Sequence, residues 1–215
     1  MKTALIAAAS AQLMDHYDYK FMEFVTTHGK SYGTRAEYDF RAAIFKNTLK
    51  FTEEHNASNQ THATEVNEMS DWTAEEWNRV LGYQVSDRVR NEVELDTTDL
   101  ADEIDWRSKG AVTPVKNQGH CGSCWSFSTT GAVEGAYFNK HGSLKSFSEQ
   151  QLVDCAQKYG NHGCQGGLMD NAFMYIEAGN PLMEEAAYPY TAKNGKTCKY
   201  EKASGVGSVA SHKDV

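Results

Sequence analysis

Two cysteines three residues apart, Cys121 and Cys124, are the residues whose types and spacing point most directly to chemistry. They lie in the stretch NQGHCGSCWSFS, residues 117–128. Such a pair can be a redox disulfide, half of a zinc site, or two thiols with separate roles. A thioredoxin-like pair should follow a strand of a βαβ unit, whereas this one follows a loop rich in Gly and Pro. A structural zinc site needs a second close pair, but Cys155 and Cys164 are nine residues apart and Cys198 stands alone.

The odd number of cysteines favours two thiols with separate roles. Five cysteines leave one unpaired after two disulfides, and that one can be a reactive thiol. Cys124 suits this role because a helix is predicted to start at Ser123, its candidate N-cap, and the amides and dipole at a helix start stabilise a thiolate. The same amides can hold an oxyanion, and Gln118 on the preceding loop can add a side-chain N–H. We therefore predict that Cys121 bridges elsewhere and Cys124 attacks.

These residues must be positioned by helices. Hydrophobic spacing, capping boxes and glycine stops predict six helices in the chain. They are expected over about residues 17–28, 37–55, 73–81, 123–139, 148–154 and 169–176. Gly142 and Gly179 stop the fourth and the sixth. A short extended piece is expected over 64–71, and valines after Thr191 suggest that strands begin there.

Composition limits the class of protein. The 215 residues are 40% hydrophobic, which suits one large domain or two smaller ones. The net charge of −8 makes nucleic acid an unexpected partner, and no apolar run reaches the ~20 residues that span a membrane. Residues 1–99 hold 17 of the 29 acidic residues and none of the cysteines. We therefore predict a domain boundary near residues 85–100.

The N-terminus, MKTALIAAASAQ, has an early lysine, a short apolar run and the small residues of a cleavage site. It is interpreted as a signal peptide over residues 1–11. Asn56 and Asn59 both stand in glycosylation triplets, which agrees with a secretory route. That route permits disulfides.

Two stretches, DWRSKGAVTPVKNQGHCGSCWSFS at 105–128 and GCQGGLMDNAF at 163–173, closely resemble the papain-like cysteine proteases, nearest to the cathepsin L branch. The resemblance implies an α+β fold: a helical prosegment, then the mainly α-helical left domain of a papain-like fold, with only the start of its β-rich right domain. The implied divisions are residues 1–11 for the signal, 12–98 for the prosegment and 99–215 for the N-terminal part of the peptidase domain.

The resemblance also implies roles for individual residues. Cys124 would be the nucleophile and Gln118 the oxyanion-hole residue. Gly166 and Gly167 would bind the substrate backbone, and Leu168 and Met169 would line the pocket for the residue before the scissile one. Arithmetic allows fifteen ways of forming two disulfides from five cysteines, and the resemblance selects Cys121–Cys164 and Cys155–Cys198. Trp125 fits a core aromatic as well as a shield beside the thiolate, whereas His120 and His162 are expected at the surface without a catalytic role.

The acidic part resembles the inhibitory prosegment of the same family. The residues that match its long-helix motif are Glu37, Arg41, Ile44, Phe45 and Asn56. The motif departs from the family pattern at Thr48 and Thr52. A second motif retains Asn67 and Asp71 but has Glu65 and Met69 where glycine and phenylalanine are usual. Asp71 is the candidate switch for release at acid pH.

The function implied is that of a cathepsin L-like endopeptidase zymogen, which cleaves polypeptides through a Cys thiolate and an acyl-enzyme, without metal or cofactor. We expect a monomer inhibited by its own prosegment, in a lysosome-like or food-vacuole compartment or outside the cell. The family's base histidine and its asparagine are expected ~130–150 residues after Cys124, beyond Val215. The chain is therefore expected to be a fragment, inactive alone. Two alternatives stay open: a protease inhibitor acting through its prosegment, and a non-catalytic truncated homologue.

Overall fold

The computed structural model describes residues 14–84 and 92–214 and divides the chain into two compact units, Met1–Glu76 and Trp77–Val215. The expected signal peptide, residues 1–11, lies outside the described residues. So do residues 85–91 of the expected domain boundary. Each unit is described by itself.

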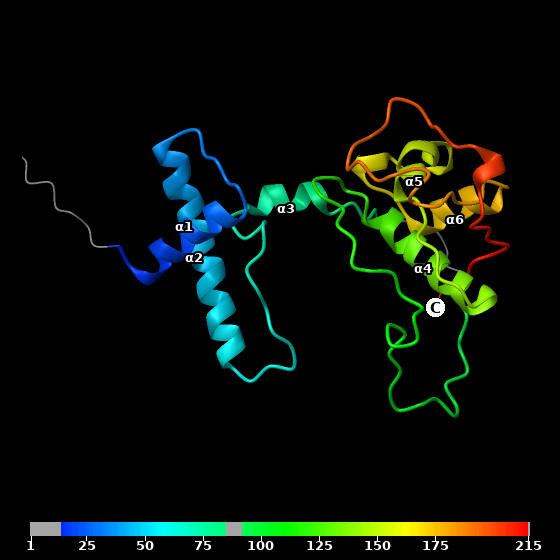
Figure 1. The fold of residues 1–215 in the computed structure, drawn as a ribbon, viewed down its shortest axis with the longest axis horizontal. Helices are drawn as coiled ribbons and strands as arrows, with labels where there is room; N and C mark the ends of the chain where they lie inside the picture. The colour runs from blue at the N-terminus through cyan, green and yellow to red at the C-terminus, as the bar shows by residue number, and fades with distance from the viewer. Residues whose placement is uncertain (1–13, 85–91, 215) are drawn as a thin grey trace, which may run out of the picture. The chain divides into compact units, whose positions relative to one another are not determined.

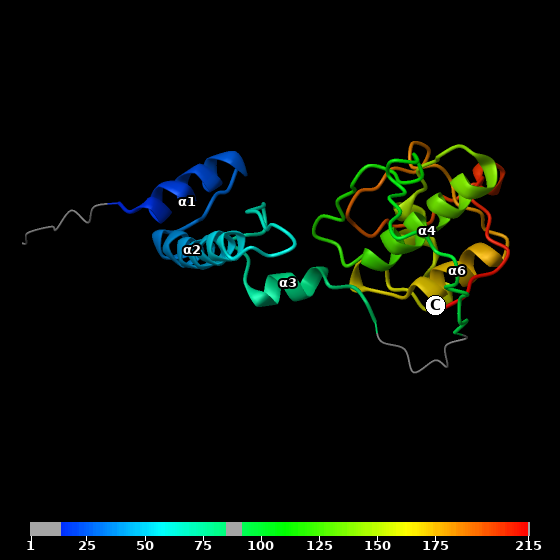
Figure 2. The ribbon, with the colours of Figure 1, turned by 90° about the horizontal axis from the view of Figure 1, so that it is seen from below.

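The first unit is built on two helices, α1 (His16–Thr27) and α2 (Arg35–Ala57), which pack against each other (Figures 1 and 2). Apolar residues at helical spacing meet between them, and the buried set is Phe21, Phe24, Phe45 and Leu49. The Phe45 ring lies 4.6 Å from the Phe24 ring and 5.4 Å from the Phe21 ring, centroid to centroid. Because a buried aromatic side chain stabilises a fold by about 2–3 kcal/mol, this cluster is the main apolar support of the unit.

A polar network ties the segment after α2 back to the helices. Arg41 donates to both carboxylate oxygens of Glu76, at 2.6 and 2.7 Å, and to the carbonyl of Asp71 at 2.9 Å. The buried Asp71 carboxylate accepts from Lys30 at 2.9 Å and from Tyr32 at 2.8 Å. Bidentate Arg–carboxylate pairs fix geometry as well as adding energy. The motif residues Arg41 and Asp71 therefore hold the first unit together.

The other polar motif residues make local contacts. The Asn56 side chain forms two 2.8 Å bonds with the main chain of Thr64, one in each direction. The Asn67 side chain accepts from the amide of Met69, and Glu37 accepts from the amide of Gly33. Among the apolar positions, Phe45 is buried in the core and Ile44 is half-buried.

The second unit is built around α4 (Cys124–His141), which packs against α5 (Glu149–Cys155) and α6 (Met169–Glu177) (Figure 1). Three short 3₁₀ turns complete it: η1 (Gln157–Tyr159), η2 (Gly163–Gln165) and η3 (Lys202–Ser204). The most deeply buried apolar side chains in this core include Trp125, Phe147, Leu152, Ile176 and Leu182. The unit also contains the end of α3 (Ala74–Val80), which crosses the division of the chain.

Local signals set the ends of these helices. Thr73 and Glu76 form the expected capping box at the start of α3, with bonds of 2.8 and 3.2 Å. Ser148 caps α5 by accepting from the amide of Gln151 at 3.0 Å. Gly142 ends α4 with a left-handed φ of 67°. The six predicted helices are therefore present, with ends shifted by a few residues.

Two disulfides fix the second unit. Cys121 is bonded to Cys164 and Cys155 to Cys198, the pairs that the family resemblance implies, and each bond joins residues 43 apart. Regular strands are not formed in the described residues, where β pairing is limited to isolated bridges such as Leu182 with Gly207. Val206 and Val209, the described valines after Thr191, therefore do not belong to a regular strand. No described helix is long and apolar enough to cross a bilayer.

Candidate active site

Cys124 is the first residue of α4. All five cysteines lie in the described residues, and Cys124 is the one that is not in a disulfide. Its side chain is half-buried. A residue at a helix start has main-chain amides beside it that can hold the oxyanion formed when its side chain attacks a carbonyl. The position therefore suits a nucleophile.

Ser123 stands at the predicted N-cap position of α4, but its side chain does not cap the helix. Its backbone, with φ −105° and ψ 16°, is not extended, and its hydroxyl makes no capping bond. That hydroxyl lies instead 2.6 Å from the hydroxyl of Tyr190, a residue 67 positions later. The Ser123 hydroxyl, which the sequence predicted to cap the helix, forms a tertiary hydrogen bond instead, because Ser123 is fully buried beside Tyr190.

The side-chain amide of Gln118 donates two hydrogen bonds to the main chain. Its Nε2 donates to the carbonyl of Cys121 at 2.8 Å and to the carbonyl of Val80 at 2.9 Å. A carbonyl oxygen held by this amide resembles the oxygen of a substrate, which would need the same donor as it becomes an oxyanion. Gln118, just before the cysteine motif, thus contacts the last residue of α3.

Residues 81–84, directly after α3, form an extended segment that bonds to Gly167. The Gly167 amide donates to the Gly82 carbonyl at 2.8 Å, and the Gln84 amide donates to the Gly167 carbonyl at 3.2 Å. Tyr83 and Gly167 therefore make an isolated parallel bridge. Both main-chain groups of the glycine expected to bind substrate are occupied by the chain itself.

The closest approach in this segment is at Gly82. A Cβ atom there would lie 1.8 Å from the carbonyl oxygen of Gly122, which real contacts do not reach. The neighbours of Gly82 face outward, with Leu81 66% and Tyr83 47% exposed. The segment therefore lies flat on the loop that precedes Cys124, and only glycine fits at its centre.

The remaining predicted substrate residues have mixed surroundings. Gly166 is buried, and its carbonyl accepts from the His162 amide at 2.8 Å. Leu168 is half-buried, and its amide donates to the Asn161 side chain at 2.9 Å. Met169 packs against the hydrophobic core, so part of its side chain serves packing. Trp125 is fully buried and donates to the Gly163 carbonyl, which makes it a core aromatic.

The structure also gathers buried charges that the sequence analysis missed. Lys116 lies 2.6 Å from both Glu134 and Glu149. Burial, with the nearby Glu149 charge adding, raises the pKa of Glu185 to about 7. Its Oε1 accepts from the Tyr190 amide at 2.7 Å, and its Oε2 is buried without a partner. No sequence signal could have found this group, since its members come from distant segments.

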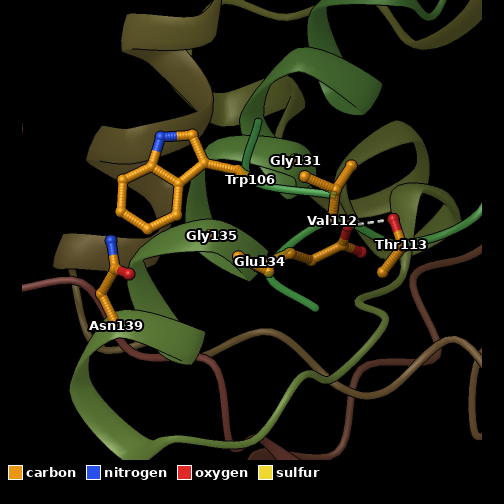
Figure 3. A pocket seen from close by; sticks show the side chains of 8 residues that line it. Trp106, Val112, Thr113, Gly131, Glu134, Gly135 and Asn139 are labelled. Atoms are coloured by element: carbon orange, nitrogen blue, oxygen red, sulfur yellow. Dashed lines mark hydrogen bonds between the residues drawn. The ribbon is translucent and has the colours of Figure 1, made fainter. Parts of the chain in front are cut away.

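A separate pocket of about 230 Å³ lies on the outer face of α4 (Figure 3). Gly131 and Gly135 leave the helix surface open there, and the Trp106 ring forms part of the wall. Glu134 accepts a 2.8 Å bond from Thr113 at the same wall. None of the predicted site residues lines this pocket. A cluster of three or more His, Cys, Asp or Glu side chains that could hold a metal ion is not found in the described part of the chain.

Comparison with known proteins decides the family. The model of the papain family cysteine protease matches residues 100–215, more than half of the chain. The chain belongs to the papain family of cysteine proteases. The model of the cathepsin propeptide inhibitor domain matches residues 21–77 of the same chain. The predicted family and the predicted fold class are therefore confirmed.

Several members of the papain family are similar over nearly the whole chain. Digestive cysteine proteinase 2 of Homarus americanus is 41% identical over 97% of this chain and 64% of its own length. Procathepsin L of Mus musculus is 40% identical, with the same two shares. The solved structure of digestive procathepsin L 3 of Tenebrio molitor has a TM-score of 0.78 and 39% identity, covering 92% of this chain and 65% of that one. The chain thus spans just under two thirds of the length of these relatives.

Proposed function

We propose that this chain is the zymogen portion of a cathepsin L-like cysteine endopeptidase, with Cys124 as its nucleophile. One observation carries the proposal: residues 80–84 of the chain take the hydrogen bonds of Gln118 and Gly167, and Gly82 lies against Gly122, two residues before the free Cys124. Groups expected to bind substrate are thus paired with the chain's own extended segment. That arrangement is expected of an inhibited protease.

The proposed chemistry follows from the groups present. The Cys124 thiolate attacks the scissile carbonyl, and the carbonyl oxygen becomes an oxyanion that the Gln118 side chain and the amide at the start of α4 stabilise. The intermediate collapses to an acyl-enzyme, which water hydrolyses. A base must form the ion pair with the thiol and protonate the leaving amine. The family supplies a histidine for that step, and none of the residues described here is assigned to it.

The chain would inhibit itself because its own residues occupy the groups that would bind substrate. Gln118 Nε2 cannot donate to a substrate oxygen while it donates to Val80, and Gly167 cannot pair with a substrate while it pairs with residues 82–84. Removal of this segment would free both. Residues 94–100 are exposed in the structure, which supports a maturation cut in the linker that ends near residue 98. N-terminal sequencing of the mature protein tests that boundary.

The finer substrate preference belongs to the same proposal. Gly166 and Gly167 would bind the substrate backbone, and Leu168 and Met169 would favour a bulky apolar residue before the scissile one. Leu168 is half-exposed and available for this contact, whereas Met169 is shared with the core. We also propose a secretory route to an acidic or extracellular compartment, which the two disulfides support.

The test is a chimera that continues this chain with the part of mouse procathepsin L that follows the matched region. After acid treatment it should hydrolyse a fluorogenic peptide with an apolar residue before the cleaved one. Cys124→Ala should abolish the activity, and Gln118→Ala should lower kcat by about 10²–10³-fold. Activity that survives Cys124→Ala, or a Gln118→Ala variant as fast as the parent, would contradict the proposal.

The occupied site can be tested in the 215-residue chain itself. Gly82→Ala places a methyl group against Gly122 and should push residues 80–84 off the site. We expect Cys124 to react faster with iodoacetamide in this variant. Gly33→Ala is the matched control, because a Cβ there meets only the far end of Glu37, at 3.9 Å.

An inhibitor acting on other proteases is the second candidate function. The match to the propeptide inhibitor domain over residues 21–77 favours it. The Cys124→Ala chain, mixed with a mature cathepsin L, distinguishes the two. Inhibition in trans together with an inactive chimera would support the inhibitor, whereas an active chimera supports the zymogen.

A further inference from the structure

The hydroxyl of Tyr190 links two parts of the candidate active site. It donates to the main-chain carbonyl of Gln118 at 2.8 Å and lies 2.6 Å from the hydroxyl of Ser123, the residue before the nucleophile. We propose that Tyr190 is a positioning residue that holds the Gln118 loop in register with the start of α4. The inference rests on the proposed function and adds a residue to it.

The single proton of the Tyr190 phenol fixes the direction of both hydrogen bonds. A phenol has one proton, and the Gln118 carbonyl can only accept, so Tyr190 donates to Gln118. Ser123 must therefore donate to Tyr190. The result is a chain of two bonds from Ser123 through Tyr190 to Gln118. Burial raises the pKa of the Tyr190 hydroxyl, so the phenol keeps its proton over the working pH range.

Tyr190 is itself fixed from two other sides. Its amide donates to Glu185 at 2.7 Å, and its ring meets the Phe127 ring edge-on, with centroids 4.8 Å apart. Phe127 belongs to the first turn of α4, so the Tyr190 ring and the Tyr190 hydroxyl both contact the same end of that helix. A side chain held by a backbone bond, a ring contact and two hydroxyl bonds has little freedom to move.

The Gln118 loop needs such a support. Residues 112–119 form no helix or strand, and loops of this kind move more than the elements beside them. Gly119 adopts a left-handed φ of 58°, and a Cβ there would lie 3.1 Å from the Cβ of Ala192. The segment that carries Tyr190 therefore backs the loop directly. Oxyanion donors work only at the right distance, and a misplacement of about 1 Å can cost about 10²-fold in rate.

The first test uses the 215-residue chain and needs no activity. Tyr190→Phe removes the hydroxyl and keeps the ring. Hydrogen exchange read by mass spectrometry should rise by about tenfold in peptides covering residues 112–123, because one lost hydrogen bond of about 1.4 kcal/mol corresponds to that factor. Tyr188→Phe is the matched control, because it removes a hydroxyl that makes two bonds, to Asp154 and to the Lys199 amide, without contact to Gln118 or Ser123. Equal exchange in the parent and Tyr190→Phe would overturn the proposal.

The second test uses the active chimera. Tyr190→Phe should lower kcat by about 10–100-fold with KM within about twofold, and should weaken a peptide aldehyde, whose adduct carries an oxyanion, by the same factor. Alkylation of Cys124 by iodoacetamide, which forms no oxyanion, should stay within about twofold. Tyr188→Phe should leave all these values unchanged. A uniform loss in both variants, or none in Tyr190→Phe, would overturn the role. An inactive parent chimera would count against the proposed function, and the exchange result would still decide the link.

Discussion

The two units of this chain are stabilised by different means. The first, up to Glu76, has no cysteine and relies on the Phe21, Phe24 and Phe45 rings and on ion pairs between its elements. The second has two disulfides and a core that encloses many polar side chains, including Glu149, Gln150 and Gln151. The second unit is therefore the more sensitive to reduction.

One carboxyl group in each unit responds to acid in the opposite way from the other. The bond from Arg41 lowers the pKa of Glu76 in the first unit to about 2, against an ordinary 4.5. Its contribution to stability is present above pH 4.5 and is lost as pH falls through 4.5 toward 2. Burial raises the pKa of Glu185 in the second unit to about 7, so its charge destabilises the fold at neutral pH. That penalty disappears as pH falls from about 7 to 4.5.

Acid therefore acts on Glu76 and Glu185 with opposite sign. Net acidic charge alone does not produce these two opposite responses. Glu76 is sensitive because an arginine holds it charged, and Glu185 because the protein interior keeps it neutral.

Loss of a disulfide should separate the units most sharply. Cys155→Ala with Cys198→Ala removes a bond between residues 43 apart, which chain entropy values at about 4 kcal/mol. Hydrogen exchange should show this loss in the second unit and none in residues 14–76. Equal loss in both units would mean that they unfold as one, and the comparison would fail.

The next effect belongs to the first unit. Glu76→Gln breaks the bidentate pair with Arg41 and should lower the free energy of unfolding by about 2–3 kcal/mol at pH 7. The variant should also lose the decline in stability between pH 4.5 and about 2. Glu75→Gln, at an exposed neighbouring position, is the control. An unchanged pH profile would remove Glu76 from the acid response and leave Asp71 as the candidate.

The opposite sign is expected in the second unit. Glu185→Gln keeps the acceptor for the Tyr190 amide and removes the charge. The free energy of unfolding at about pH 7.5 should rise by about 2 kcal/mol, after allowance for partial exposure, and should change little at about pH 4.5. Urea unfolding at the two pH values measures this. A loss of stability at the higher pH would show that a partner such as Lys116 compensates the Glu185 charge.

Helix caps should give the smallest difference. Ser148→Ala removes a buried hydroxyl that caps α5 and also donates to the Tyr188 carbonyl, so we expect a loss of about 2 kcal/mol. Thr34→Ala removes an exposed cap of α2 and should cost about 1 kcal/mol. Thermal unfolding of both variants measures the two losses of stability. A larger loss for Thr34→Ala would contradict the expectation that the buried cap contributes more than the exposed one.

The sequence by itself determined the local features of this protein. The capping box at Thr73, the side-chain cap at Ser148 and the stop at Gly142 were predictable because they depend on residues three or four positions apart, whose spacing a helix fixes. The cysteine motif and the odd cysteine count singled out Cys124, and the family resemblance supplied the disulfide pairing. Composition also predicted an acidic, cysteine-free first part.

Only the tertiary structure decided the contacts that join distant segments. Arg41 meets Glu76 across 35 positions, and Ser123 leaves its expected capping role for Tyr190, 67 positions away. The pKa of Glu185 depends on how deeply the fold buries it, and the occupation of Gln118 depends on where residues 80–84 lie. Periodicity and spacing carry no information about such pairs, because each arises when chain segments are brought together and water is excluded between them.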